Sequence, residues 1–367
     1  MPRPLTPLFD PVTRHGRKPP VPTAYSLASG ALTDQRDTAA GTATVGWLYK
    51  VSEIITGGAF GTGPNPAFDN ARQNLYLLKR SSATAGATLS YDVSDPVTPV
   101  LLDTLNGQIF HAAGYDPINE RIYGANSASD GFGSVDATDP SALTVIAFVS
   151  TGGLGQPHAL IFDSGATAVF PSALSGSDPG RLFVTSAPSF SSILDYSVTG
   201  TTRQFRIEKV DENTVLGISQ NGTAVLLDIT NRAAPSVTWL VSSPATSFSR
   251  FALGSSSSYW YGEDAAGGQN LAIRLISDGS LFGSVATPMS ISFGTVGDGG
   301  RYIALIGDTE CCVADLNVPT APRFSNVVTY ASRGIATDNT WGGLAISNVQ
   351  RLVAASGATY TLQLLAW

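Results

Sequence analysis

The sequence predicts an all-β fold, a seven-bladed β-propeller, on three observations. A short motif that opens with Asp recurs along the chain, turn-linked β-hairpins recur at intervals of 43 to 49 residues, and the composition is rich in small turn-forming residues. Periods of about 20 to 50 residues are typical of propellers and solenoids, and four strands in about 45 residues make one propeller blade.

Composition excludes several classes of protein. Apolar residues make up 43% of the chain and charged residues only 13%, which indicates one large sheet core. The net charge of −7 would repel a phosphate backbone, so we expect no nucleic-acid partner. No apolar run reaches about 18 residues and the first residues carry no secretory signal, so we expect no membrane span and synthesis in a cytosol.

Residues 1–44 differ from the rest and are predicted to form an extended N-terminal arm. Seven prolines fall within the first 22 positions, and proline fixes φ and removes backbone donors. A loose tail is one interpretation. A docked arm is the one we favour, because its apolar side chains exceed what a solvated linker needs. The expected partner-binding residues are Arg3, Leu5, Leu8, Phe9, Arg14, Arg17, Lys18 and Tyr25.

Residues 45–367 are predicted to form the propeller. Its seven inner hairpins turn at Asp69, Asp116, Asp163, Asp211, Ser255, Asp298 and Ser347. An apolar or β-branched run follows each turn and is expected to be the second strand of its blade: 74–78, 121–123, 167–170, 214–218, 259–261, 301–305 and 351–354. The third strands are expected to end at the repeated motif, and the fourth strands to follow its proline.

The last unit offers only three strands before the chain ends at Trp367. A further strand is available in residues 45–57, and pairing it with the last strand would remove two unpaired sheet edges. We therefore expect the N- and C-terminal strands to pair and close the ring. We also expect that deleting residues 360–367 gives insoluble protein.

The repeated motif begins at Asp92, Asp136, Asp228 and Asp315. An Asp side chain there is expected to accept backbone N–H groups of the turn, while proline presets φ; a calcium site would need more oxygens than each copy offers. The motif resembles that of LVIVD-repeat β-propellers of bacterial and archaeal surface-associated proteins. The resemblance covers four of the seven units, implies the propeller fold, and implies no single reaction.

Candidate sites for chemistry are few. His111 and His158 lie 47 residues apart, each five residues before a turn Asp, so we expect them near the axial channel with Arg206 and Arg250. No carboxylate completes a metal-binding group with the two histidines, and we expect no cofactor. Cys311 and Cys312 are adjacent in a predicted strand and should point to opposite faces as buried thiols. The five tryptophans are expected to pack in the core, with sugar stacking as the alternative.

Two functional hypotheses remain open. The first is a non-enzymatic structural or interaction protein, docked through residues 1–44 onto other subunits of a larger assembly. A bacteriophage virion fits this hypothesis by architecture alone, in a tail or head position and with a host-surface receptor or glycan as a further partner. The second is a cytoplasmic or surface propeller that uses an axial pocket near His111 and His158 as an enzyme or ligand binder.

Overall fold

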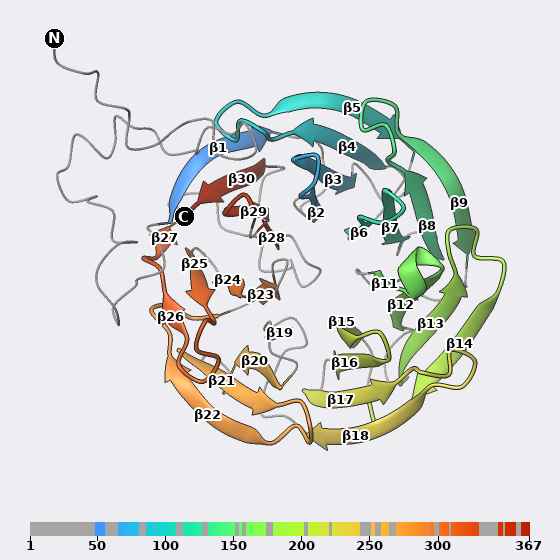
Figure 1. Cartoon of the computed structure of the whole chain (residues 1–367), viewed down its shortest axis with the longest axis vertical. Helices are drawn as coiled ribbons and strands as arrows, with labels where there is room; N and C mark the ends of the chain where they lie inside the picture. The colour runs from blue at the N-terminus through green and yellow to red at the C-terminus, as the bar shows by residue number, and fades with distance from the viewer. Residues whose placement is uncertain are drawn as a thin grey trace, which may run out of the picture.

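The chain forms seven small antiparallel sheets arranged around a central axis (Figure 1), which confirms the predicted seven-bladed propeller. The computed structural model describes residues 48–55, 65–80, 86–107, 113–126, 131–150, 154–155, 159–173, 179–201, 205–219, 222–242, 251–253, 258–263, 269–291, 293–296, 301–307, 310–329, 344–347, 349–356 and 361–367. No helix in these ranges is long and apolar enough to cross a membrane.

Within each blade the strands follow one another from the axis to the rim. Blades 1 and 2 contain β2 (Asn65–Asp69), β3 (Asn74–Arg80), β4 (Gly86–Asp92) and β5 (Val100–Asn106), then β6 (Ala113–Asp116), β7 (Arg121–Asn126), β8 (Gly131–Asp136) and β9 (Thr144–Ser150). Blade 3 contains β10 (Leu154–Gly155), β11 (Leu160–Phe162), the 3-10 turn η2 (Asp163–Gly165), β12 (Thr167–Ala173), β13 (Gly180–Ser186) and β14 (Ile193–Val198).

The remaining blades repeat the pattern. Blades 4 and 5 contain β15 (Phe205–Asp211), β16 (Thr214–Ser219), β17 (Thr223–Asp228) and β18 (Ser236–Ser242), then β19 (Phe251–Leu253), β20 (Tyr259–Glu263), β21 (Asn270–Leu275) and β22 (Leu281–Ala286). Blade 6 contains β23 (Phe293–Val296), β24 (Tyr302–Ile306), β25 (Glu310–Asp315), β26 (Arg323–Phe324) and β27 (Val328–Thr329). Blade 7 contains β28 (Leu344–Ser347), β29 (Leu352–Ser356), β30 (Thr361–Ala366) and β1 (Tyr49–Ile55).

The strand assignments predicted from turn spacing are confirmed. The seven expected second strands are β3, β7, β12, β16, β20, β24 and β29, and the motif aspartates end the third strands β4, β8, β17 and β25. Because the strands are antiparallel, the turns between strands one and two and between strands three and four share one face of the disc. The predicted turn residues Ser255 and Asp298 lie outside the described residues.

The apolar core is divided among the junctions between neighbouring blades. Seven buried clusters occur in the described residues, and each draws side chains from two consecutive blades. Successive residues of a middle strand therefore face opposite junctions, as expected for strands buried on both sides. Cys311 faces blade 7 and Cys312 faces blade 5. Both are buried and form no disulfide, as the sequence predicts.

The ring is closed by strands from the two ends of the propeller. β1 pairs with β30 from Tyr49 opposite Ala366 to Ile55 opposite Thr361, and Figure 1 shows β1 beside β30 at the C-terminus. This confirms the predicted closure by residues within 45–57. The arm itself, and the domain boundary predicted at residue 44, lie outside the described residues.

Removal of residues 360–367 is expected to yield insoluble protein, because it deletes β30 and exposes an apolar face of blade 1. A graded test is Leu364→Ala, which empties a fully buried position between β1 and β29 and should cost about 2–5 kcal/mol of unfolding free energy in urea titrations. Ile55→Ala is the matched control, since Ile55 is 73% exposed on β1 and should change stability by no more than about 0.5 kcal/mol. A soluble truncation with unchanged melting would contradict the closure.

Candidate functional site

The predicted axial pocket falls largely outside the described residues. The described residues do not include His111, His158 or Arg250. For Arg206 only the backbone is described, and it lies in β15 opposite Ile218 of β16. Within the described ranges, no group of three or more His, Cys, Asp or Glu side chains is arranged to hold a metal ion. The pocket therefore stays a prediction.

The expected partner-binding residues of the arm, Arg3, Leu5, Leu8, Phe9, Arg14, Arg17, Lys18 and Tyr25, also lie outside the described residues. The point from which the arm departs is described, because Leu48 immediately precedes β1. Leu48 is 1% exposed and belongs to the cluster between blades 6 and 7.

A single asparagine of blade 6 holds the backbone of Leu48. Asn326 Oδ1 accepts the Leu48 N–H at 2.6 Å, and Asn326 Nδ2 donates to the Leu48 carbonyl at 2.9 Å. Asn326 lies between β26 and β27. There, residues 325–327 of the outermost segment of blade 6 lie opposite residues 312–313 of β25, so the strand pairing is interrupted. The arm consequently starts from a fixed point between blades 6 and 7.

The repeated motifs perform the turn chemistry predicted for them. Asp92 accepts the Ser94 N–H at 2.7 Å, and equivalent bonds of 2.8–2.9 Å reach Asp136, Asp228 and Asp315 from the residue two positions ahead. The backbone and side-chain hydrogen bonds of Thr138 hold the pKa of Asp136 below its ordinary value.

Each of the seven blade junctions is also tied by a side chain that donates to a main-chain carbonyl of the neighbouring blade. In the described residues, going around the ring, these bonds run from Arg72 Nη1 to Ala137 O (2.6 Å), Asn119 Nδ2 to Ser164 O (3.2 Å), Lys209 Nζ to Ile161 O (2.8 Å), Trp239 Nε1 to Ile276 O (2.8 Å), Tyr261 Oη to Pro319 O (3.0 Å), Asn326 Nδ2 to Leu48 O (2.9 Å) and Ser52 Oγ to Pro96 O (2.6 Å). Each bond gives a carbonyl of one blade a donor from the neighbouring blade, so the contacts stabilise the disc.

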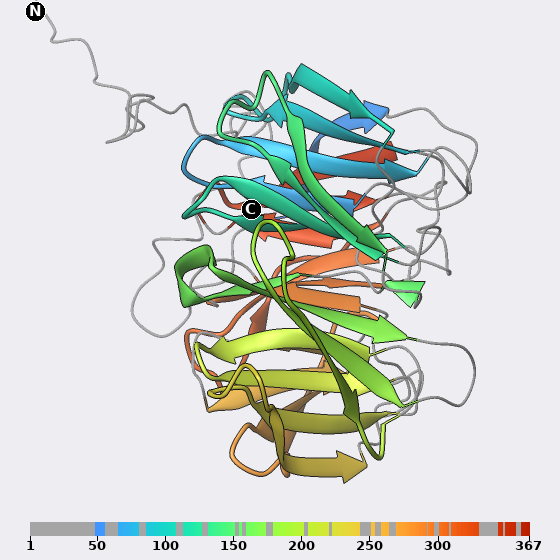
Figure 2. The ribbon, with the colours of Figure 1, turned by 90° about the vertical axis from the view of Figure 1, so that its right-hand side faces the viewer.

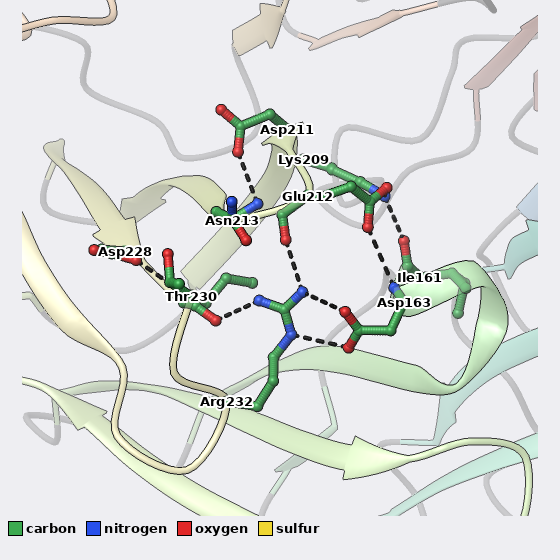
Figure 3. Close-up of polar contacts among 10 residues, drawn as sticks. Ile161, Asp163, Lys209, Asp211, Glu212, Asn213, Asp228, Thr230 and Arg232 are labelled. Carbon is green, nitrogen blue, oxygen red and sulfur yellow. Dashed lines mark hydrogen bonds and ion pairs between the residues drawn. The ribbon is translucent and has the colours of Figure 1, made fainter.

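The junction of blades 3 and 4 carries the densest polar network (Figure 3). Arg232 donates to both carboxylate oxygens of Asp163, at 2.8 and 3.1 Å, and to the carbonyl of Glu212 at 2.7 Å. Lys209 Nζ lies 4.5 Å and Arg232 Cζ 5.0 Å from the centre of the buried Phe162 ring. The bond from Arg232 holds the pKa of Asp163 below its ordinary value. The carboxylate is thus already occupied, which makes this cluster a structural tie between blades.

The turn that presents Asp163 has an unusual backbone. Asp163, Ser164 and Gly165 all have positive φ, at 53°, 52° and 89°. A Cβ at Gly165 would lie 1.6 Å from Asn119 Nδ2, so only glycine allows the close approach of blades 2 and 3 here.

Sequence reasoning missed Asn326, Arg232 and Lys209. Each acts on a backbone or carboxylate far away along the chain, and neither spacing nor residue type marks such a contact. The tryptophans agree with core packing where they are described: Trp260 and Trp367 are buried, and Trp239 is partly buried with its Nε1–H bonded. Trp47 and Trp341 lie outside the described residues.

Comparisons with known proteins show the fold alone. No protein-family model matches the sequence, and no curated protein matches it. A functionally unknown protein from Desulfotomaculum acetoxidans superposes with a TM-score of 0.59 at 11% identity, covering 82% of this chain and 90% of that one. A protein from Lactobacillus plantarum superposes with a TM-score of 0.58 at 12% identity, covering 75% and 87%. Neither likeness transfers an activity.

Asn326→Ala is expected to cost about 1–3 kcal/mol of unfolding free energy, since it leaves both backbone groups of Leu48 without a partner at a buried junction. Asn326→Asp keeps the acceptor for the Leu48 N–H but loses the donor to the Leu48 carbonyl. The Leu48 amide should therefore be better protected from hydrogen exchange in Asn326→Asp than in Asn326→Ala. Denaturant titration and hydrogen exchange measure the two effects. Equal stability of all three proteins would refute the anchoring role.

Arg232→Met is expected to raise the pKa of Asp163 towards the ordinary value of 3.8. Because the folded-state pKa is lowered, the pair stabilises the protein above pH 3.8, and this contribution disappears as the pH falls through the folded pKa. Asp163 is partly exposed, so the ion pair contributes only about 0.2–1 kcal/mol at neutral pH. Carboxylate titration by NMR gives the pKa; Arg301→Met, which breaks the pair with Asp315 inside blade 6, should leave Asp163 unmoved.

Proposed function

We propose that this chain is a non-enzymatic structural or interaction protein, a propeller that docks through its N-terminal arm in a larger assembly. The observation that carries the proposal is the anchored root of the arm. Leu48 is buried, bonded on both its backbone groups by Asn326 and followed at once by the closing strand β1. Because the arm starts from a fixed point on a closed ring, a partner bound to the arm is held near a defined place on the propeller.

Charge supports a protein partner for the arm. Residues 1–47 contain five Lys or Arg and three Asp or Glu, whereas the rest of the chain contains 16 and 25. The arm and the disc therefore carry opposite net charge, which favours attraction between the arm of one subunit and an acidic surface of another. The prolines of the arm reduce the entropy lost on docking, because their φ is already restricted.

The finer parts of the proposal concern the setting. A bacteriophage virion, in a tail or head position, suits a rigid disc with a tether, and exposed parts of the disc would be available to a host-surface receptor or glycan. Membership of the LVIVD-repeat propellers is supported by the motif copies at Asp92, Asp136, Asp228 and Asp315, whose carboxylates shape turns of the same kind in four blades.

Deletion of residues 2–40 is expected to leave a folded propeller that no longer joins its assembly. The removed segment lies before Leu48, so the seven junction clusters lose no described side chain. Expression of full and truncated chains in the source organism, followed by sedimentation of particles, gives the readout, with thermal melting as the check on folding. If the truncated chain sediments with the particles in the same amount as the intact chain, the proposal is wrong.

A further inference from the structure

The outermost strand of each blade presents an unpaired edge, and most of these edges are interrupted. An extra residue bulges from the outer strand in blades 1, 2, 4, 5 and 7: Leu102, Ile146, Thr238, Phe282 and Val51. In blade 6 the outer strand is split into β26 and β27 of two residues each. Bulges and short edge strands prevent another chain from adding to a sheet.

Blade 3 is the exception among the described outer strands. β14 pairs with β13 without a register shift, from Val198 opposite Gly180 to Ile193 opposite Thr185. Figure 2 looks onto this rim of the disc, where β14 lies in yellow-green. Six consecutive residues thus form a regular edge that a partner strand can extend.

The backbone groups of alternate residues on β14 are available for such a strand. Ser186 N donates to Ser192 O at 3.2 Å, so the even-numbered residues of β14 pair with β13. The amides of Ile193, Asp195 and Ser197 consequently face away from the blade. All three residues are exposed.

The charged side chain on β14 does not prevent another strand from pairing with this edge either. Asp195 is the charged residue of β14, and Arg181 on β13 neutralises it through a 2.8 Å bond from Nε and a second contact from Nη2. Ile193 adds an apolar side chain that is 41% exposed. An incoming neutral, β-forming segment would therefore meet no repulsion.

The arm contains one segment of this kind. Residues 2–22 hold seven prolines and lack the donors that a strand needs, whereas residues 23–47 hold none. Within residues 23–29, Thr-Ala-Tyr-Ser-Leu-Ala-Ser, the larger apolar residues Tyr25 and Leu27 alternate with small ones and no charge is present. The 18 residues that separate this segment from Leu48 span at most about 60 Å when extended, at ~3.3 Å per residue.

The positions of the two features favour a neighbouring copy as the partner. Figure 1 shows β1, where the arm starts, and β14 on opposite sides of the ring. A propeller of ~320 residues has a radius of gyration of about 20 Å, so the arm is long enough to reach the disc beside it. Because root and receptor lie on opposite sides, each arm contact joins two different surfaces, and it forms either by reciprocal exchange between two copies or by repetition from copy to copy.

We propose that β14 is the receptor for the arm of a neighbouring copy, which adds residues 23–29 as a fifth strand to blade 3. The inference rests on the proposed function and names its partner. Main-chain hydrogen bonds would supply affinity and the side chains of Tyr25 and Leu27 specificity, as in other cases of strand addition.

Cysteine crosslinking in the full chain tests the contact. A copy with Ser26→Cys or Ala28→Cys is mixed with a copy carrying Ile193→Cys and mildly oxidised; the native cysteines are fully buried. The control is Leu281→Cys, 50% exposed on the bulged strand β22. Docking should give at least about tenfold more crosslinked dimer with Ile193→Cys, because it raises the local thiol concentration. Equal yields, or crosslinks only between two Ile193→Cys copies, would overturn the arm as occupant.

A second experiment separates this inference from the proposed function. Ser197→Pro removes an outward amide, whereas Ser197→Ala keeps it, so sedimentation velocity at high protein concentration should show lost self-association in the first only. If deletion of residues 2–40 abolishes self-association but Ser197→Pro does not, the arm docks elsewhere and β14 is not the receptor. If the deletion leaves self-association intact, the arm does not join copies of this chain and the inference fails, whereas the proposed function fails only if the truncated chain still sediments with the particles.

Discussion

The pairing of β1 with β30 is the constraint on which the rest of the structure depends. Each blade buries both of its faces against its neighbours, so no blade can be stable with one face in water. Blade 7 is the one built from both ends of the propeller, and its β1 and β30 ladder joins clusters that involve blades 6 and 1. Opening this ladder would expose apolar surface on two sides at once, which makes closure cooperative with folding of the ring.

Apolar packing alone does not set the relative position of two blades, because it is not directional. The side-chain donors at the junctions are directional. Each reaches a main-chain carbonyl, whose place is determined by the backbone of the neighbouring blade, as with Tyr261 and Pro319 or Trp239 and Ile276. The buried Tyr261 ring has its pKa raised by desolvation, so its hydroxyl stays protonated and remains a donor at neutral pH.

Most of the fold could be predicted from the sequence because its signals are local. A turn Asp bonds backbone groups two or three residues ahead, as Asp69 does with Ala71 and Arg72, and Asp116 and Asp211 make the same kind of bond in blades 2 and 4. The junction bonds could not be predicted. Leu48 and Asn326 are 278 residues apart, and the donors differ in type from one junction to the next, so no repeat reveals them. The bulges of the outer strands depend on backbone geometry that composition does not record. The predicted pocket and arm residues lie outside the described part of the chain and stay predictions.

A ring of similar blades has no distinguished position on its rim, and its use in an assembly depends on departures from that equivalence. Two departures are present here. Blade 6 uses Asn326 to anchor the chain at Leu48, and blade 3 presents the one regular outer edge among the described strands. They lie three blades apart in one sense and four in the other, so a single contact that joins one to the other uses different surfaces of the two copies. Two copies that exchange arms reciprocally form a two-fold dimer, whereas the same contact repeated in one direction forms a closed ring or an open filament according to the rotation between neighbours.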